Sequence, residues 1–141
     1  RAFGQRGDRP WRVGIRDPRG DGVLAGLTID GDEAVFTSGD YERSYEHDGT
    51  RYHHLLDPRT GRPARGVTSV TVLHEEGATA DAAATALFVA DEDQWPRIAK
   101  QMGIEAVLRV DDEGVLHLTP AMAERLELEK DGATTRIVEL P

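Results

Sequence analysis

The chain has 141 residues, 17 basic and 26 acidic, for a formal net charge of −9, and it contains no cysteine. This length suits one domain, and the lack of cysteine excludes disulfide bonds and thiolate metal sites. Any bound metal would need oxygen or imidazole ligands. The acidic balance argues against binding to nucleic acids or membrane surfaces. No run of 18 apolar residues is present, so we expect no membrane span within this chain.

The first third of the chain predicts three short strands joined by turns. Residues 1–10 are polar and glycine-rich, which is typical of a loop. Three following segments alternate or are largely apolar and are expected to be strands: Trp11–Ile15, Val23–Ile29 and Glu33–Thr37. The next residues, Ser38-Gly39-Asp40, are expected to break the strand pattern.

The stretch Thr37–Pro63 is the one around which a binding site is expected. It holds all three tyrosines and three of the five histidines. Asp48-Gly49 favours a two-residue turn, which would place Tyr45 opposite Tyr52. Because strand side chains alternate, one hairpin face would carry Tyr41, Arg43, Tyr45, Tyr52, His54 and Leu56, and the other Glu42, Ser44, Glu46, Arg51, His53 and Leu55. Rings, a guanidinium and an imidazole on one face would suit a flat, anionic ligand.

The second half changes periodicity. Ala78–Ala90 is alanine-rich without glycine or proline, which predicts a helix with Thr79 as its N-cap and Asp81 in its first turn. Further elements are expected at Val67–Leu73 (strand), Glu92–Met102 (helix, regular from Trp95 or Pro96 and closed by Gly103), Ile104–Val110 with Val115–Leu118 (hairpin), Thr119–Leu126 (short helix) and Thr134–Leu140 (strand).

About seven or eight short strands and two or three helices are therefore expected. Most strands are connected by turns rather than by crossover helices. This pattern predicts an α+β fold with a largely antiparallel sheet and two or three helices packed on it.

Several candidate site residues have two interpretations. His54 could be a general base or a structural histidine on a half-buried strand, with His53 pointing the other way as the natural control. Asp81 and Thr85, four residues apart on one helix face, could bind Mg²⁺ or could reflect helix-start chemistry and a solvent-facing threonine.

The same ambiguity holds for the cations and glycines. Arg43, Arg51, Arg59, Arg62 and Arg65 cluster in the sequence and could bind phosphates or belong to a solvated loop. Gly39 and Gly61 could allow close approach of a ligand, or they could serve turns alone.

Taken together, these segments resemble the ApbE family, the FAD:protein FMN transferases. The resemblance rests on motifs spread through most of the chain: AFG followed by W-x-V-x-I-x-D-P (Ala2–Pro18), T-S-G-D-Y-E-R (Thr37–Arg43), D-G-x-R-Y-H-H-L-L-D-P-R-T-G-R-P (Asp48–Pro63), S-V-T-V (Ser69–Val72) and A-D-A-x-A-T-A-L-F-V (Ala80–Val89). A departure is Ala90-Asp91, where the family more often has Met-Gly.

The resemblance implies Mg²⁺-dependent transfer of FMN from FAD to a threonine hydroxyl of an acceptor flavoprotein, with release of AMP. Some family members instead hydrolyse FAD to FMN and AMP. By the same resemblance, Asp81 and Thr85 would bind the metal and His54 would be the base. The walls of the FAD site would be formed by Ser38, Gly39, Asp40 and Tyr41 and by Asp57, Arg59, Thr60 and Gly61.

Family members also carry a sizeable portion before the AFG segment. We therefore expect residues 1–141 to be the C-terminal part of an ApbE-like domain, which could be an inactive flavin-binding fragment without the N-terminal part. The resemblance further implies an acceptor subunit of a bacterial redox complex, of the sodium-pumping or Rnf type, as the partner. It also implies a periplasmic or membrane-anchored location facing the periplasm.

Overall fold

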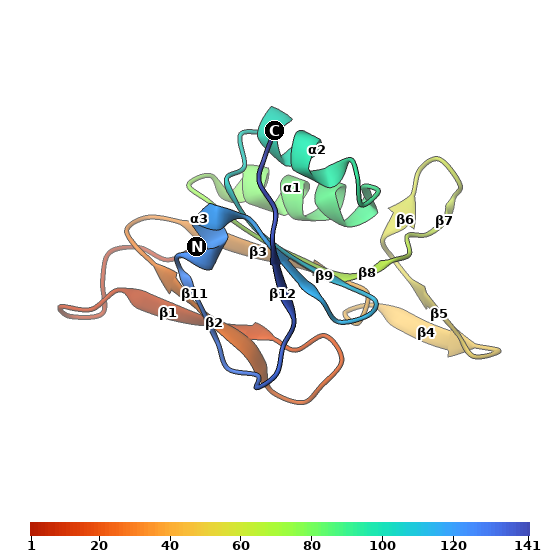
Figure 1. The fold of residues 1–141 in the computed structure, drawn as a ribbon, viewed down its shortest axis with the longest axis horizontal. Helices are drawn as coiled ribbons and strands as arrows, with labels where there is room; N and C mark the ends of the chain where they lie inside the picture. Colours follow the sequence, from red (N-terminus) through yellow and green to blue (C-terminus); the bar gives the residue numbers. More distant parts are fainter.

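The computed structural model describes residues 1–141 as two larger sheets, two two-stranded hairpins and three helices (Figure 1). The main sheet has five strands in the order β12 (Thr135–Ile137), β10 (Leu116–Leu118), β9 (Ala106–Asp111), β8 (Val67–His74) and β3 (Ala34–Gly39). Helices α1 (Gly77–Val89) and α2 (Trp95–Gln101) cover one face of this sheet. A three-stranded sheet of β1 (Trp11–Arg16), β2 (Val23–Ile29) and β11 (Leu126–Leu128) lies against the other face, beside α3 (Pro120–Ala123). None of the helices is long and apolar enough to cross a lipid bilayer.

Two hydrophobic cores follow from this layering. Strand β8 is buried along almost its whole length, and its β-branched residues suit such a central position. Val70 and Val72 pack toward α1, whose alanines and the ring of Phe88 are also buried. Leu73 packs toward the second sheet. Small alanine side chains allow α1 to lie close to the sheet, which fixes its position relative to β3 and β8.

The α+β class and the largely antiparallel pairing are confirmed, with one exception in the pairing. Five of the six strand pairs in the two larger sheets are antiparallel, while β12 runs parallel to β10. Helix α2 begins at Trp95 and Gly103 closes it with φ of +70°, as expected. The structure has twelve strands rather than seven or eight, because several contain only two to four residues.

Two expected strand and helix ends are wrong. Ser38 and Gly39 do not break the strand: they continue β3 and pair with Val70 and Ser69 of β8. The short helix after Thr119 ends at Ala123 rather than Leu126. Leu126 instead begins strand β11, where it pairs with Leu27 of β2, because the second sheet provides it with a partner strand.

The start of α1 also differs from the expectation. The helix begins at Gly77, and Glu76 rather than Thr79 occupies the N-cap position. The Thr79 hydroxyl lies inside the first turn and donates to the Glu76 carboxylate over 3.1 Å. Asp81 therefore lies in the second turn, and the first turn contains no acidic residue. Helix-start electrostatics do not explain Asp81, because the dipole effect is confined to the first turn.

The expected hairpin is confirmed in its register. Strands β4 (Ser44–His47) and β5 (Thr50–His53) are joined by Asp48-Gly49, both with positive φ, and Tyr45 lies opposite Tyr52. The two tyrosine rings stack with centroids 5.2 Å apart. The segment after it is not a plain loop but a second, smaller hairpin of β6 (Leu56–Asp57) and β7 (Arg62–Pro63).

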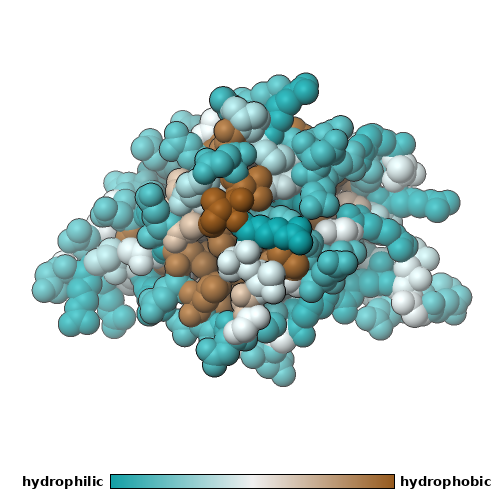
Figure 2. Space-filling view, viewed as in Figure 1, coloured by the Kyte–Doolittle hydropathy of each residue, from teal (hydrophilic) through white to brown (hydrophobic).

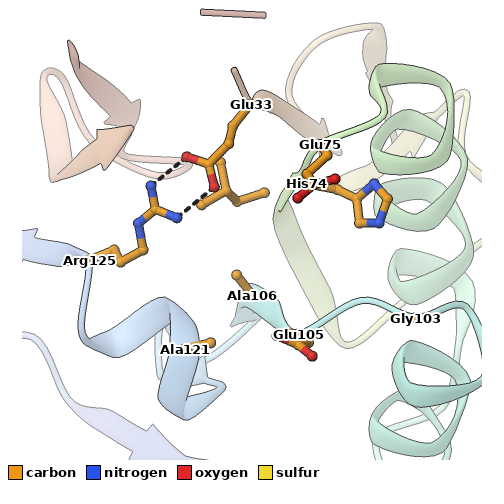
Figure 3. Close-up of a pocket in the computed structure, with 9 residues that line it drawn as sticks. Glu33, His74, Glu75, Gly103, Glu105, Ala106, Ala121 and Arg125 are labelled. Carbon is orange, nitrogen blue, oxygen red and sulfur yellow. Dashed lines mark hydrogen bonds and ion pairs between the residues drawn. The ribbon is translucent and has the colours of Figure 1, made fainter. Parts of the chain in front are cut away.

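A charged pair links the two sheets. Arg125 donates from both terminal nitrogens to the Glu33 carboxylate, at 2.7 and 2.5 Å, and also donates to the Thr28 carbonyl oxygen. Figure 3 shows the Glu33 and Arg125 side chains facing each other in this arrangement. The hydrogen bond from Arg125 lowers the pKa of Glu33 below its ordinary value.

We expect Glu33→Gln to lower the free energy of unfolding by about 1 kcal/mol at pH 7, because it removes a charge-assisted pair that is partly exposed to solvent. A lowered folded-state pKa means that this contribution is present above the ordinary carboxyl pKa and is lost as the pH falls through the folded-state value. Urea unfolding of both proteins at pH 7 and pH 3 should show a difference that shrinks at pH 3. A difference independent of pH would contradict this assignment.

Candidate functional site

Side chains with oxygen atoms from two elements lie close together where the end of β3 lies beside α1. The Ser38 and Thr85 hydroxyl oxygens are 3.1 Å apart and hydrogen-bonded. Asp81 lies one helical turn before Thr85, and its exposed carboxylate makes no hydrogen bond or ion pair. One carboxylate and two hydroxyls are the ligand types that Mg²⁺ prefers. No group of three or more His, Cys, Asp or Glu side chains could hold a metal ion, so a cation here would need further hydroxyl, carbonyl, water or bound-ligand oxygens.

The corner after Ser38 owes its shape to Gly39. A β-carbon built on Gly39 would lie 2.5 Å from the ring of Tyr41, far inside contact distance. The Arg16 guanidinium lies over the same ring, 5.3 Å from its centroid. Burial, and then the nearby Glu42 carboxylate, raise the pKa of Tyr41. Glycine is therefore needed at position 39 to leave space for the ring of Tyr41, and not to form a turn.

We expect Gly39→Ala to displace the ring of Tyr41 and to destabilise the protein by about 1–3 kcal/mol, because the new methyl group overlaps a packed side chain. The backbone of Gly39 does not have positive φ, so the cost comes from the clash alone. Thermal unfolding of Gly39→Ala beside Gly39→Ala/Tyr41→Ala would separate the causes. If the clash is responsible, the alanine at 39 costs much less when Tyr41 is absent. An equal cost in both backgrounds would contradict it.

Asp40 is a buried carboxylate already bound by two arginines. Arg19 donates to both of its oxygens, at 2.7 and 2.5 Å, and Arg51 lies 3.8 Å away. The hydrogen bond to Asp40 raises the pKa of Arg19. Asp40 and both arginines line a cavity of about 240 Å³. Asp40 thus positions arginines at this cavity, and Arg19 is a lining residue that the sequence analysis missed.

The loop between β6 and β7 is tied to the end of α1. Asp57 accepts hydrogen bonds from the backbone N–H and the side chain of Arg59, and Arg59 also donates to both oxygens of Asp91, at 2.6 and 3.1 Å. These bonds lower the pKa of Asp57 and Asp91 and raise that of Arg59. The Thr60 hydroxyl accepts from the N–H of Arg62. Asp91, at the position that departs from the family pattern, holds the loop against the helix.

Gly61 and the arginine cluster can now be interpreted separately. Gly61 has φ of +68° with open space around it, and its N–H donates to the Asp57 carbonyl oxygen, so it serves the turn. Two of the five clustered arginines, Arg51 and Arg59, are engaged by carboxylates. Three exposed arginines make no ion pair: Arg43, Arg62 and Arg65.

The two adjacent histidines point to opposite sides, as their alternation predicted. His53 is buried, and its Nε2 hydrogen-bonds the Ala64 carbonyl oxygen at 2.9 Å. Because a carbonyl oxygen only accepts, Nε2 carries the proton. The ring of His53 also packs edge-on against Phe88 of α1, with centroids 5.6 Å apart. His54 is exposed, and its side chain makes no hydrogen bond; its backbone N–H donates to the Arg43 carbonyl oxygen.

A further surface cavity lies away from these residues. It has a volume of about 400 Å³ and is lined by Glu33, His74, Glu75, Glu105 and Arg125 among others (Figure 3). No candidate residue lines it. The structure instead brings Ser38 together with Thr85 beside Asp81, places Asp57 to Gly61 in one loop anchored to Asp91, and leaves His54 in solvent at the base of the hairpin.

The structure thus combines a largely antiparallel α+β fold with paired hydroxyls and a carboxylate without a protein partner at a strand–helix junction, which are oxygen groups of the kind that a hard cation prefers. The sequence model of the ApbE family matches residues 1–108, and the chain belongs to this family. It is 52% identical over 141 residues to the FAD:protein FMN transferase of Rhodobacter capsulatus, covering 99% of this chain and 27% of that protein. With the enzyme of the same name from Treponema pallidum it shares 43% identity over 108 residues, 74% of this chain and 30% of that protein.

Solved structures agree with this assignment. The ApbE protein of Thermotoga maritima aligns with a TM-score of 0.79 and 42% identity, over 87% of this chain and 40% of that one. The flavin transferase ApbE from Vibrio cholerae aligns with a TM-score of 0.65 and 34% identity, over the same shares of the two chains. The chain thus spans less than a third of the two curated relatives and about 40% of these two solved chains.

Proposed function

We propose that the protein transfers FMN from FAD to a threonine hydroxyl of an acceptor flavoprotein, in a Mg²⁺-dependent reaction that releases AMP. Membership of the ApbE family and the names of the relatives support the reaction class. The observation that carries the proposal for this chain is the junction of Ser38, Thr85 and Asp81. It presents oxygen ligands and a carboxylate without a protein partner.

Asp81 and Thr85 would hold the magnesium ion. When bound, the ion would neutralise charge on the pyrophosphate of FAD. The residues from Ser38 to Tyr41 and from Asp57 to Gly61 would line the FAD site. In that arrangement Asp40 and Asp57 would keep Arg19, Arg51 and Arg59 in place rather than touch phosphate themselves.

His54 would accept the proton of the acceptor hydroxyl. The threonine oxygen would form a bond to the phosphorus of the FMN half, the pyrophosphate bond would break, and AMP would leave. Two features support this role: the imidazole is exposed, and neither ring nitrogen is engaged in a hydrogen bond. Imidazole is the side chain that most often serves as a general base toward a hydroxyl nucleophile.

We further propose that residues 1–141 form the C-terminal part of the transferase domain and that an N-terminal portion completes the flavin pocket. The coverage of the relatives supports this, since each is several times longer than the matched segment. The acceptor would be a subunit of a bacterial redox complex, and the enzyme would work in the periplasm or anchored to the membrane facing it.

Incubation of the full-length protein with FAD, Mg²⁺ and the soluble threonine-bearing domain of an Rnf-type acceptor subunit tests the proposal. We expect the mass of the acceptor to increase by one FMN moiety, with one AMP released for each transfer, and no product with EDTA or with the acceptor threonine changed to valine. Absence of covalent flavin would overturn the proposal. AMP release without acceptor would indicate FAD hydrolysis, and Mg²⁺-independent FAD binding without AMP would indicate a flavin-binding protein.

A further inference from the structure

We propose that the outer face of the β4–β5 hairpin, formed by Tyr45, Tyr52, His54 and Leu56, is the docking surface for the acceptor polypeptide. This inference rests on the proposed function, because it requires a second protein chain to bring its threonine to His54. Tyr52, His54 and Leu56 are alternate residues of one segment, and Tyr45 lies opposite Tyr52 on the neighbouring strand, so all four belong to one face.

The face is strongly exposed for its apolar content. Tyr45 is 65% exposed and Leu56 is 51% exposed, although both side chains are large and largely apolar. The hairpin extends away from the sheets and helices (Figure 1), and β4 pairs only with β5. In the view of Figure 2 the strongly hydrophobic side chains gather over the middle of the molecule, whereas the projecting hairpin at the right is of intermediate to hydrophilic character, as expected for tyrosines among polar residues. Exposed tyrosines on a projecting element are typical of protein interfaces, where rigid rings give contact area at low entropic cost.

The opposite side of the same segment explains why this face is held in place. His53 and Leu55 point inward, where Leu55 belongs to the core under α1 and His53 packs on Phe88. His54 and Leu56 therefore point outward from a fixed backbone. The proposed base thus lies at the anchored end of the hairpin, and the tyrosine pair lies farther toward its tip. A polypeptide lying along the hairpin would pass from the tyrosines to His54.

The shape of this face favours a protein chain over the flavin. The rings of Tyr45 and Tyr52 already stack on each other at 5.2 Å, so no flat ligand can enter between them. None of the four residues lines any of the five main cavities, of which one reaches the other side of the hairpin at Arg51 and His53. The unpaired outer edge of β4 adds free backbone groups, to which an extended segment of the acceptor could hydrogen-bond.

The test is the kinetics of Tyr45→Ala in the full-length protein with the soluble acceptor domain. We expect the KM for the acceptor domain to rise about tenfold or more, as for a central interface tyrosine. The kcat and the dissociation constant for FAD should not change. Tyr45→Phe should restore the wild-type KM. Ser44→Ala, at an exposed position on the opposite face of the hairpin, is the matched control and should leave all three constants unchanged.

Other outcomes overturn the inference. An unchanged acceptor KM in Tyr45→Ala would exclude this face as the docking surface. A weakened affinity for FAD with an unchanged acceptor KM would assign the face to the flavin pocket instead. If the wild-type protein transfers no FMN, the proposed function itself fails. Calorimetric binding of the acceptor domain to wild-type and Tyr45→Ala protein still tests the docking surface, and equal affinities would overturn it.

Discussion

Replacement of Asp81 by alanine is expected to reduce Mg²⁺-dependent FMN transfer by at least about 100-fold while leaving the thermal stability nearly unchanged. The loss follows from removing the only carboxylate at the junction of Ser38 and Thr85. Stability should be maintained because the Asp81 side chain is exposed, lacks hydrogen bonds and ion pairs, and lies beyond the first helical turn. Substitutions at such positions usually change stability by less than about 0.5 kcal/mol.

The measurement is the rate of acceptor flavinylation over a range of Mg²⁺ concentrations, together with a melting curve. Glu75→Ala is the matched control, since Glu75 is an exposed acid just before the same helix. It should leave both the rate and the magnesium requirement unchanged. Asp81→Asn, which keeps the shape and removes the charge, should require more Mg²⁺ than wild type. Full activity of Asp81→Ala at limiting magnesium would remove Asp81 from the metal site.

The elements with strong local patterns were predictable from sequence. The register of the β4–β5 hairpin followed from Asp48-Gly49 and the alternation of side chains, and the two opposite orientations of His53 and His54 followed from that register. The alanine-rich composition of Ala78–Ala90 predicted α1, although not its first residue. Thr79 and Glu76 lie within one turn of each other, and which of them is the cap depends on backbone angles that local composition does not determine.

Contacts between distant segments were not predictable. Arg19 reaches Asp40 from a turn 21 residues earlier, and Asp91 meets Arg59 across 32 residues. No local pattern marks either pair, because the packing of α1 and the turn at Arg19 brings them together. The same is true of Ser38 and Thr85, which the family resemblance named but which only the fold places in contact. Clustered arginines suggested phosphate binding, yet two of the five are occupied by these carboxylates.

Alanine substitutions of the adjacent histidines His53 and His54 should separate an effect on the transfer rate from an effect on stability. We expect His54→Ala to slow transfer by about 10²–10⁴-fold, the usual contribution of a general base, with an unchanged melting temperature. His53→Ala should do the reverse. It removes a buried hydrogen bond to Ala64 and the edge-on contact with Phe88, and should cost about 2–4 kcal/mol of unfolding free energy.

Both variants are compared at a temperature where His53→Ala remains folded, with flavinylation rate and circular dichroism melting as the two readouts. His54 contributes no buried contact, so a drop in melting temperature for His54→Ala would mean that its side chain supports the fold. Equal loss of activity in the two folded variants would show that shape at the base of the hairpin, rather than a base at position 54, limits the reaction. Because the opposite orientations of the two rings are fixed by the register of β4 and β5, a difference confined to His54 would point to its outward imidazole as the proton acceptor.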